Sequence, residues 1–292
     1  MHIGVIGLGL IGGSFAKAAT RLGHTVSVWN RTKATAQRAV DDGSAVAVLD
    51  DELKSEKGSP RIFFISLPPA NVVDWIERHE QYFPQDTIVV DATGVKQTVC
   101  KALEKYAFST RWCFVGGHPM AGKEVSGYEN ACADLFDGAS MILTPYPTCS
   151  RKTIEVLYAL FKGVGFERIV TTFPDAHDRM IALTSQMAHV VSAAYVKDPL
   201  SPEHIGFSAG SFRDMTRVAG VDPNVWSDLF LANRDSLSET VDGMIARLRE
   251  FNEAIKSSDK EKLVSLLEES KNAKKKILEA DAQEKTDNII LK

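Results

Sequence analysis

A glycine-rich segment near the N-terminus constrains the fold more than any other part of the sequence. It reads Gly7-Leu8-Gly9-Leu10-Ile11-Gly12 and joins an apolar strand-like run, Ile3–Ile6, to a helix expected over Ile11–Leu22. In this pattern the first glycine permits a tight turn, the second lets a pyrophosphate approach the backbone, and the third lets helix and strand pack closely. Free N–H groups at the helix start, here on Leu10 and Ile11, favour an anion. The segment therefore predicts a dinucleotide site at Gly7, Gly9 and Gly12.

The residues after the second expected strand, Thr25–Trp29, indicate which dinucleotide binds. Sites that prefer NAD place an Asp or Glu there for the ribose 2′-hydroxyl, whereas NADP sites avoid this charge and offer arginine. Here the sequence is Asn30-Arg31-Thr32-Lys33, an amide followed by two cations and a hydroxyl. We therefore expect NADP to be favoured over NAD, with Asn30, Arg31 and Thr32 as contacts. The alternative, in which Arg31 and Lys33 are ordinary solvated residues, stays open.

Apolar strand-like runs alternate with helical segments through the first half of the chain. This alternation predicts an α/β fold with a Rossmann-type parallel sheet covered by helices on both faces. After Pro174, apolar residues recur at helical spacing instead, most clearly over Ser236–Ile255. We therefore expect a dinucleotide-binding domain over residues 1–171 and an all-helical substrate-binding and dimerisation domain over residues 172–292. The remaining expected strands are Ile62–Ser66, Thr87–Asp91, Cys113–Gly116, Met141–Thr144 and Glu167–Val170, and the remaining helices are Thr32–Asp42, Arg151–Lys162, Asp175–Val196, Val221–Asn233 and Asp259–Ala280.

The composition is that of an ordinary globular protein and excludes several classes. The 292 residues, 44% of them hydrophobic, suffice for two packed cores. With 34 basic and 38 acidic side chains the formal charge is −4, which argues against nucleic-acid binding. No apolar run approaches the ~18 residues that span a bilayer, and no basic segment precedes the first strand, so we expect neither a membrane protein nor a signal peptide. The four cysteines form no CxxC pair and show no metal-ligand spacing, so we expect reduced thiols, no metal site and a cytoplasmic location.

A histidine follows the strand expected over Cys113–Gly116. His118 precedes Pro119, which places it on extended backbone outside a helix. Ligands of open α/β sheets bind beyond the carboxyl ends of the strands. His118 is therefore a candidate general base that accepts a proton from a substrate hydroxyl.

The helix expected over Asp175–Val196 has two different sides. Its only long charged side chain between Asp178 and Val196 is Arg179, whereas a solvated face normally carries several Lys and Glu. We therefore expect its polar side to line a cleft between the domains. The polar side comprises Asp178, Ala182, Ser185, Gln186 and His189, and the opposite apolar stripe comprises Met180, Leu183, Met187, Val191 and Ala194.

Two arginines further along the chain are candidates for binding a substrate carboxylate. Arg213 and Arg217 are four residues apart and share one face of a helix. The planar guanidinium matches a carboxylate in a bidentate manner. Structural pairing with Asp214 or Asp222 is the alternative.

Together these segments resemble the prephenate/arogenate dehydrogenase family of tyrosine biosynthesis. They follow the family's order and cover nearly the whole chain. The resemblance implies oxidative decarboxylation of prephenate to 4-hydroxyphenylpyruvate, in which a hydride leaves the ring for the nicotinamide, the ring carboxylate departs as carbon dioxide and the ring becomes aromatic. The matching stretches are GLGLIGGS at Gly7–Ser14, GGHPMAGKEVSG at Gly116–Gly127, DAHD at Asp175–Asp178 and SFRDMTR at Ser211–Arg217, with Trp226 and Asn233 after it.

The resemblance also implies roles for individual residues. His118 resembles the family's catalytic histidine, which takes the proton from the ring hydroxyl. Arg217 resembles the arginine that holds a substrate carboxylate, and His189 resembles the second histidine of the substrate pocket.

At two positions this sequence departs from the family. The family often has Asp-x-x-Ser-Val-Lys after its fifth strand, with the serine bonded to the ring hydroxyl, but Asp91–Lys96 has Gly94 at that place. We take Thr93, one residue away, as the candidate replacement. The family's Ser-His-Leu-Pro-His is Ser185–His189 here, so we expect Gln186 to contact the substrate in a different way.

Several alternatives stay open. An arogenate dehydrogenase, which forms tyrosine, fits the same motifs, although the retained His189 favours prephenate. A β-hydroxyacid dehydrogenase relies on a lysine in its interdomain helix, and Asp175–Val196 contains none. A regulator that binds NADP without turnover is the third alternative. We also expect a homodimer through helices such as Ser236–Ile255, and no additional regulatory or chorismate mutase domain.

Overall fold

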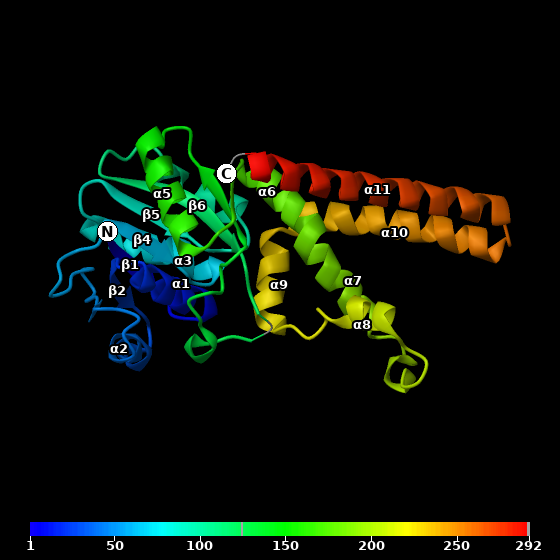
Figure 1. Ribbon diagram of the computed structural model, residues 1–292, viewed down its shortest axis with the longest axis horizontal. Helices are drawn as coiled ribbons and strands as arrows, with labels where there is room; N and C mark the ends of the chain where they lie inside the picture. Colours follow the sequence, from blue (N-terminus) through cyan, green and yellow to red (C-terminus); the bar gives the residue numbers. More distant parts are fainter. Residues whose placement is uncertain (124, 291–292) are drawn as a thin grey trace. The chain divides into compact units, whose positions relative to one another are not determined.

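An eight-stranded sheet organises the first part of the chain in the computed structural model, which describes residues 1–123 and 125–290, with side chains described up to residue 283 (Figure 1). The strand order is β3-β2-β1-β4-β5-β6-β7-β8. Neighbouring strands are parallel except β6 and β7, which are antiparallel, so the expected sheet is mostly rather than wholly parallel. The strands are β1 (His2–Ile6), β2 (Thr25–Trp29), β3 (Ala47–Val48), β4 (Ile62–Ile65), β5 (Thr87–Asp91), β6 (Trp112–Met120), β7 (Ser140–Pro145) and β8 (Arg168–Thr171).

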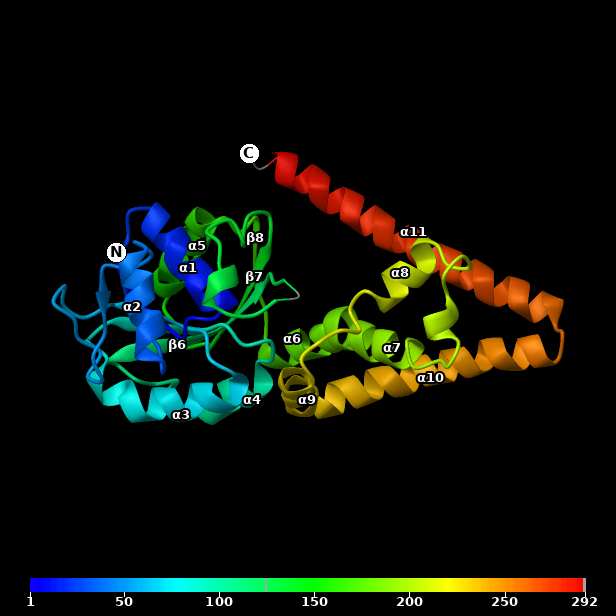
Figure 2. The same cartoon turned by 90° about the horizontal axis from the view of Figure 1, so that it is seen from below.

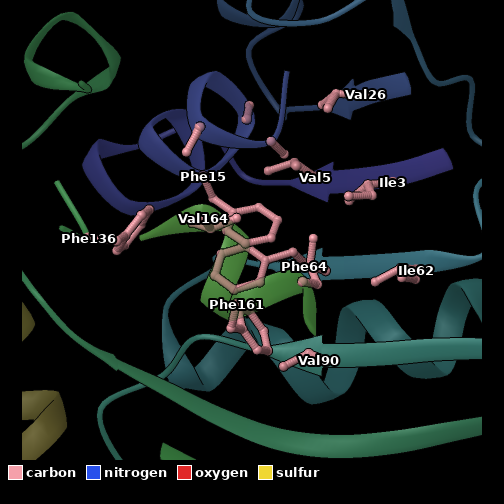
Figure 3. Packing of buried hydrophobic residues seen from close by; sticks show 14 of the residues in the cluster. Ile3, Val5, Phe15, Val26, Ile62, Phe64, Val90, Phe136, Phe161 and Val164 are labelled. Carbon is pink, nitrogen blue, oxygen red and sulfur yellow. The ribbon is translucent and has the colours of Figure 1, made fainter. Parts of the chain in front are cut away.

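Helices cover both faces of this sheet, as the alternating sequence pattern predicts. Figure 2 shows α3 and α4 along one face and α1, α2 and α5 along the other. On the α1 face, Phe15 stacks on Phe64 with ring centroids 3.9 Å apart and lies beside Phe161 (Figure 3). On the α3 face, Trp75 and Phe83 belong to a second buried cluster. These helices are α1 (Leu10–Arg21), α2 (Lys33–Asp41), α3 (Pro69–His79), α4 (Gln97–Leu103) and α5 (Arg151–Val164), with short 3₁₀ turns at Glu80–Tyr82, Glu104–Tyr106 and Tyr128–Asn130.

Beyond β8 the described residues form helices without strands, as the sequence predicts. The helix expected over Asp175–Val196 is continuous but contains a π-helical turn, Ala182–Gln186, between α6 and α7. A π turn takes one extra residue per turn and often occurs at functional sites. None of the helices in the described part of the chain is long and apolar enough to cross a membrane. The helices are α6 (Pro174–Ile181), α7 (Met187–Tyr195), α8 (Gly210–Thr216), α9 (Pro223–Ala232), α10 (Arg234–Lys256) and α11 (Lys260–Ile290), with a 3₁₀ turn at Ser201–Glu203.

The contacts divide the chain into two compact units. The first runs from Met1 to Leu237 and contains the sheet together with α6–α9, and the second begins at Ser238. In the second unit α10 and α11 are joined by a tight turn, after which the Asp259 side chain accepts the backbone N–H of Lys262. Within α11, Leu266 is buried and Leu267 is 59% exposed.

Candidate functional site

The glycine turn lies at the carboxyl end of β1 and has the geometry that the sequence predicts. Gly7 has a φ of +87°, a conformation that favours glycine, and a Cβ there would collide with the backbone oxygen of Ser66. A Cβ on Gly12 would collide with the Gly7 carbonyl. A Cβ on Gly9, in contrast, would meet no atom within 4 Å. The turn is therefore closely packed on the protein side and open in front of Gly9.

This open side fits a dinucleotide phosphate. The first N–H groups of α1, including those of Leu10 and Ile11, have no partner within the helix, and no described side chain caps it. The Leu8 N–H donates to Asn30 Oδ1 over 2.9 Å, so Asn30 holds the turn to the end of β2. Arg31 and Thr32 follow at exposed positions, and neither carries a carboxylate.

His118 lies on the same edge of the sheet, within β6. The expectation that this strand ends at Gly116 is wrong, because antiparallel pairing with β7 continues through Met120 and places His118 opposite Ile142. The Gly117 N–H donates to Asp91 Oδ1 over 2.9 Å at the carboxyl end of β5. His118 therefore projects from a strand held on both sides.

A buried ion pair supports this part of β6. Lys96 Nζ lies 2.5 Å from Asp91 Oδ2 and 2.5 Å from the carbonyl oxygen of Gly117, and neither charged side chain is exposed. A buried charge is tolerated when it is paired and hydrogen-bonded in this way. The pair therefore joins the carboxyl ends of β5 and β6 just before His118.

Among the described residues, the His118 imidazole is hydrogen-bonded through Nδ1 alone. Its Nδ1 lies 2.9 Å from Nε2 of His177, and Nδ1 of His177 lies 2.7 Å from Oδ1 of Asp178. The Asp178 carboxylate also accepts the backbone N–H groups of Lys96 (2.8 Å) and Gln97 (2.9 Å). Burial lowers the pKa of His118 well below its ordinary value, and His177 and Lys96 lower that pKa further. His118 is therefore a neutral base at neutral pH.

Gly94 lies next to the other nitrogen of His118. A Cβ on Gly94 would be 3.7 Å from His118 Nε2 and 3.4 Å from a methyl group of Leu229 in α9. No hydrogen bond joins this Nε2 to any other described residue. The basic nitrogen therefore faces a space that a side chain on residue 94 would partly fill.

Two predicted substrate contacts have partners within the protein. The Thr93 hydroxyl, 3% exposed, bonds to the Asp91 carboxylate and to the Val95 carbonyl. The Gln186 amide, 2% exposed, donates to the Leu229 carbonyl over 3.0 Å and accepts from Asn233 over 2.7 Å. These bonds give both residues a structural role, and their contact with the substrate stays a prediction.

The polar side of α6 and α7 is buried, and much of the opposite apolar stripe is exposed. Asp178 and Ala182 are inaccessible, whereas Met180 is 58% and Leu183 55% exposed. The polar side therefore packs against the protein. His189 belongs to it, and its ring stacks on Trp226 of α9 with centroids 3.6 Å apart.

The two candidate arginines lie on or next to α8. Arg213 lies within this helix, and Arg217 is its C-cap residue. Both arginines therefore belong to one helix, as their four-residue spacing predicts. Both are exposed. None of the His118 contacts described above involves Arg213.

Sequence reasoning missed most of the residues that surround His118. Asp91, Lys96 and His177 were not predicted as site residues, although His177 lies in the matching stretch Asp175–Asp178 and the other two bound the segment Asp91–Lys96, and Asp178 was assigned only to the polar stripe. Which of them meet is determined by contacts between residues up to 82 positions apart.

Comparisons with known proteins agree with this geometry. Residues 15–170 match the family described as prephenate dehydrogenase, nucleotide-binding domain, and residues 173–269 match the prephenate dehydrogenase dimerization domain. The chain is 31% identical over 282 residues to the cyclohexadienyl dehydrogenase of Zymomonas mobilis, covering 94% of each chain. Over 278 residues it is 28% identical to the prephenate dehydrogenase of Bacillus subtilis, covering 91% of this chain and 73% of the relative.

Two solved structures have the same fold over nearly the whole chain. Synechocystis arogenate dehydrogenase is 26% identical, with a TM-score of 0.81 and coverage of 95% of this chain and 100% of that one. Prephenate dehydrogenase from Aquifex aeolicus, in complex with hydroxyphenyl propionate and NAD⁺, is 29% identical, with a TM-score of 0.81 and coverage of 95% and 98%. The glycine turn, the histidine on β6 and the matches over both parts of the chain lead to one conclusion: this protein belongs to the prephenate dehydrogenase family of oxidoreductases.

Proposed function

We propose that this chain catalyses the oxidative decarboxylation of prephenate to 4-hydroxyphenylpyruvate. The observation that carries the proposal is the His118 imidazole, whose Nε2 is open at the same sheet edge as the glycine turn. A neutral histidine there accepts the proton of a ring hydroxyl. The dinucleotide, when bound, supplies the hydride acceptor.

The chain's own residues bind the dinucleotide, accept the proton and bind the substrate carboxylate. The glycine turn and the N–H groups of Leu10 and Ile11 hold the pyrophosphate, as their open side indicates. His118 takes the hydroxyl proton at Nε2, so that oxygen gains electron density while the ring loses its hydride and its carboxylate. Arg217, with Arg213 beside it, binds a substrate carboxylate by its guanidinium fork.

Arogenate is the alternative substrate. Prephenate and arogenate differ in the side chain, which carries a keto group in one and an amino group in the other. We favour prephenate because the second histidine of the family's substrate pocket is retained here as His189, whose ring lies flat against Trp226. An assay with both compounds distinguishes the two.

The test of catalysis replaces His118 by Asn. We expect dinucleotide binding to persist and kcat with prephenate and NADP to fall about 10²–10⁴-fold, since the proton acceptor is lost. Reduced nicotinamide absorbance measures the rate, and His24→Asn, just before the amino end of β2, is the matched control. Near-normal turnover in His118→Asn contradicts the mechanism, and NADP binding without turnover in the wild type identifies a regulator instead.

We further propose that NADP is favoured over NAD. The end of β2 offers Asn30, the exposed cation Arg31 and the Thr32 hydroxyl, without the carboxylate that binds a ribose 2′-hydroxyl. Replacing Arg31 by Ala is expected to raise the KM for NADP at least tenfold and to change the KM for NAD little. Lys57→Ala removes an exposed cation elsewhere in the sheet-bearing unit and serves as the control. Equal changes in the two KM values contradict the assignment.

A homodimer completes the proposal. The matching C-terminal family is described as a dimerization domain, and apolar side chains are exposed on α6 and α7. Burial of such a surface against a second copy is favourable.

A further inference from the structure

The two ring nitrogens of His118 have different surroundings. Nδ1 lies 2.9 Å from His177 Nε2, and Nε2 faces the space beside Gly94. A neutral imidazole carries its proton on only one nitrogen, so it can accept a proton at Nε2 only when Nδ1 is the protonated atom. The hydrogen bond at the other nitrogen selects the tautomer.

Asp178 determines the direction of the hydrogen bonds toward His118. Its carboxylate offers only acceptors, and it already receives the backbone N–H groups of Lys96 and Gln97. The Nδ1 atom of His177, 2.7 Å from Oδ1, must therefore carry a proton. When His177 carries only this proton, its Nε2 is an acceptor, and His118 donates its Nδ1–H to it.

We propose that His177 and Asp178 are positioning residues that hold His118 in the tautomer with an unprotonated Nε2. His118 alone meets the substrate: the hydroxyl O–H bond breaks, the Nε2–H bond forms, and the Nδ1–H remains with His177. The positive charge that develops on His118 is then stabilised along bonds that end on the Asp178 carboxylate.

The burial of His177 and Asp178 protects the hydrogen bonds of this arrangement from solvent. Asp178 is inaccessible and His177 is 2% exposed, so solvent does not compete for the bonds. Asp178 also joins α6 to the start of α4, which fixes the position of both imidazoles relative to β6. This inference rests on the proposed function for its kinetic readout, whereas the tautomer can be measured without turnover.

The kinetic test compares two substitutions of His177. Phe removes the acceptor for His118 Nδ1–H while leaving both backbone bonds of Asp178, so we expect kcat to fall about 10²–10⁴-fold with KM changed less than about threefold. Gln keeps a carbonyl acceptor and is expected to retain at least about tenfold more activity than Phe. Asp175→Asn, an exposed carboxylate on the same helix, is the control and should leave kcat unchanged.

The second test measures the tautomer directly. Nitrogen-15 NMR of the ¹⁵N-histidine-labelled protein, with the His118 signals assigned by their loss in His118→Asn, should show a protonated Nδ1 and a bare Nε2. A wild-type His118 protonated at Nε2, or a kcat for His177→Phe within about threefold of the wild type, overturns the proposal. If the wild type turns over neither prephenate nor arogenate, the proposed function fails and the spectra alone decide the tautomer.

Discussion

At the scale of single residues, the site is defined by what stands next to each nitrogen of His118. One nitrogen is bonded to His177, and the other faces Gly94. Gly94 does not require glycine for conformational reasons, since its φ lies outside the left-handed region and a Cβ would make only ordinary contacts. The missing side chain is therefore a feature of the pocket rather than of the backbone.

A substitution at Gly94 tests this reasoning. Gly94→Ala should fold normally but lower kcat/KM for prephenate about tenfold or more, because its methyl group occupies space beside the basic nitrogen. Gly94→Ser should retain more activity than Ala, since its hydroxyl can hydrogen-bond to the substrate oxygen. Gly220→Ala, where a Cβ meets no atom within 4 Å, is the matched control. Steady-state kinetics measure kcat/KM for each variant. A Gly94→Ala enzyme with the wild-type kcat/KM would show that residue 94 does not border the bound substrate.

At the scale of elements, α6 and α7 show that an amphipathic pattern does not by itself determine which side of a helix packs against the rest of the chain. Met180 and Leu183 stay exposed while Gln186 on the polar side is buried. An apolar face left open in one chain is typical of a surface that a second copy covers.

The dimer prediction follows from this face. Leu183→Asp places a charge where about 2 kcal/mol of apolar burial is expected, which corresponds to a roughly 30-fold or larger increase in the dimer dissociation constant. Sedimentation equilibrium should shift from twice the chain mass of 32.0 kDa toward the single-chain mass. Lys152→Asp introduces the same charge on α5 and should leave the wild-type mass unchanged. A wild-type protein of single-chain mass would contradict the homodimer.

At the scale of the whole molecule, histidines with lowered pKa values couple folding to pH. Burial lowers the pKa of His118, His2 and His24 below the ordinary value of 6.5. Unfolded histidines bind protons below about pH 6.5, whereas these three remain neutral in the folded protein to lower pH. The unfolded state then binds more protons, so the free energy of unfolding must decrease as the pH falls through this range.

Urea denaturation at a series of pH values tests this linkage. The urea midpoint, followed by tryptophan fluorescence, should fall between about pH 7 and pH 5.5. His118→Asn removes the group with the most strongly lowered pKa and should make this decrease smaller. An identical pH dependence in wild type and His118→Asn would show that His118 does not contribute.

The sequence by itself determined the features that depend on neighbouring residues. The turn at Gly7–Gly12 follows from local sterics, and the alternation of strands and helices follows from apolar spacing, so both were predicted closely. The strand bounds of β2 and β5 agree fully with the prediction. His118 was recognised because the proline after it indicates extended backbone and because ligands of open α/β sheets bind beyond the carboxyl ends of the strands.

The tertiary structure alone decided which distant groups meet. β6 extends through His118 because β7 pairs with it, and Asp178 reaches Lys96 across 82 positions of the chain. Gln186 forms internal hydrogen bonds for the same reason: its partners, Leu229 and Asn233, come from a segment that the local pattern does not place. Local sterics and spacing act over a few residues, whereas hydrogen-bond pairing and burial depend on the folded chain, so His118 was visible in the sequence and the residues hydrogen-bonded to it were not.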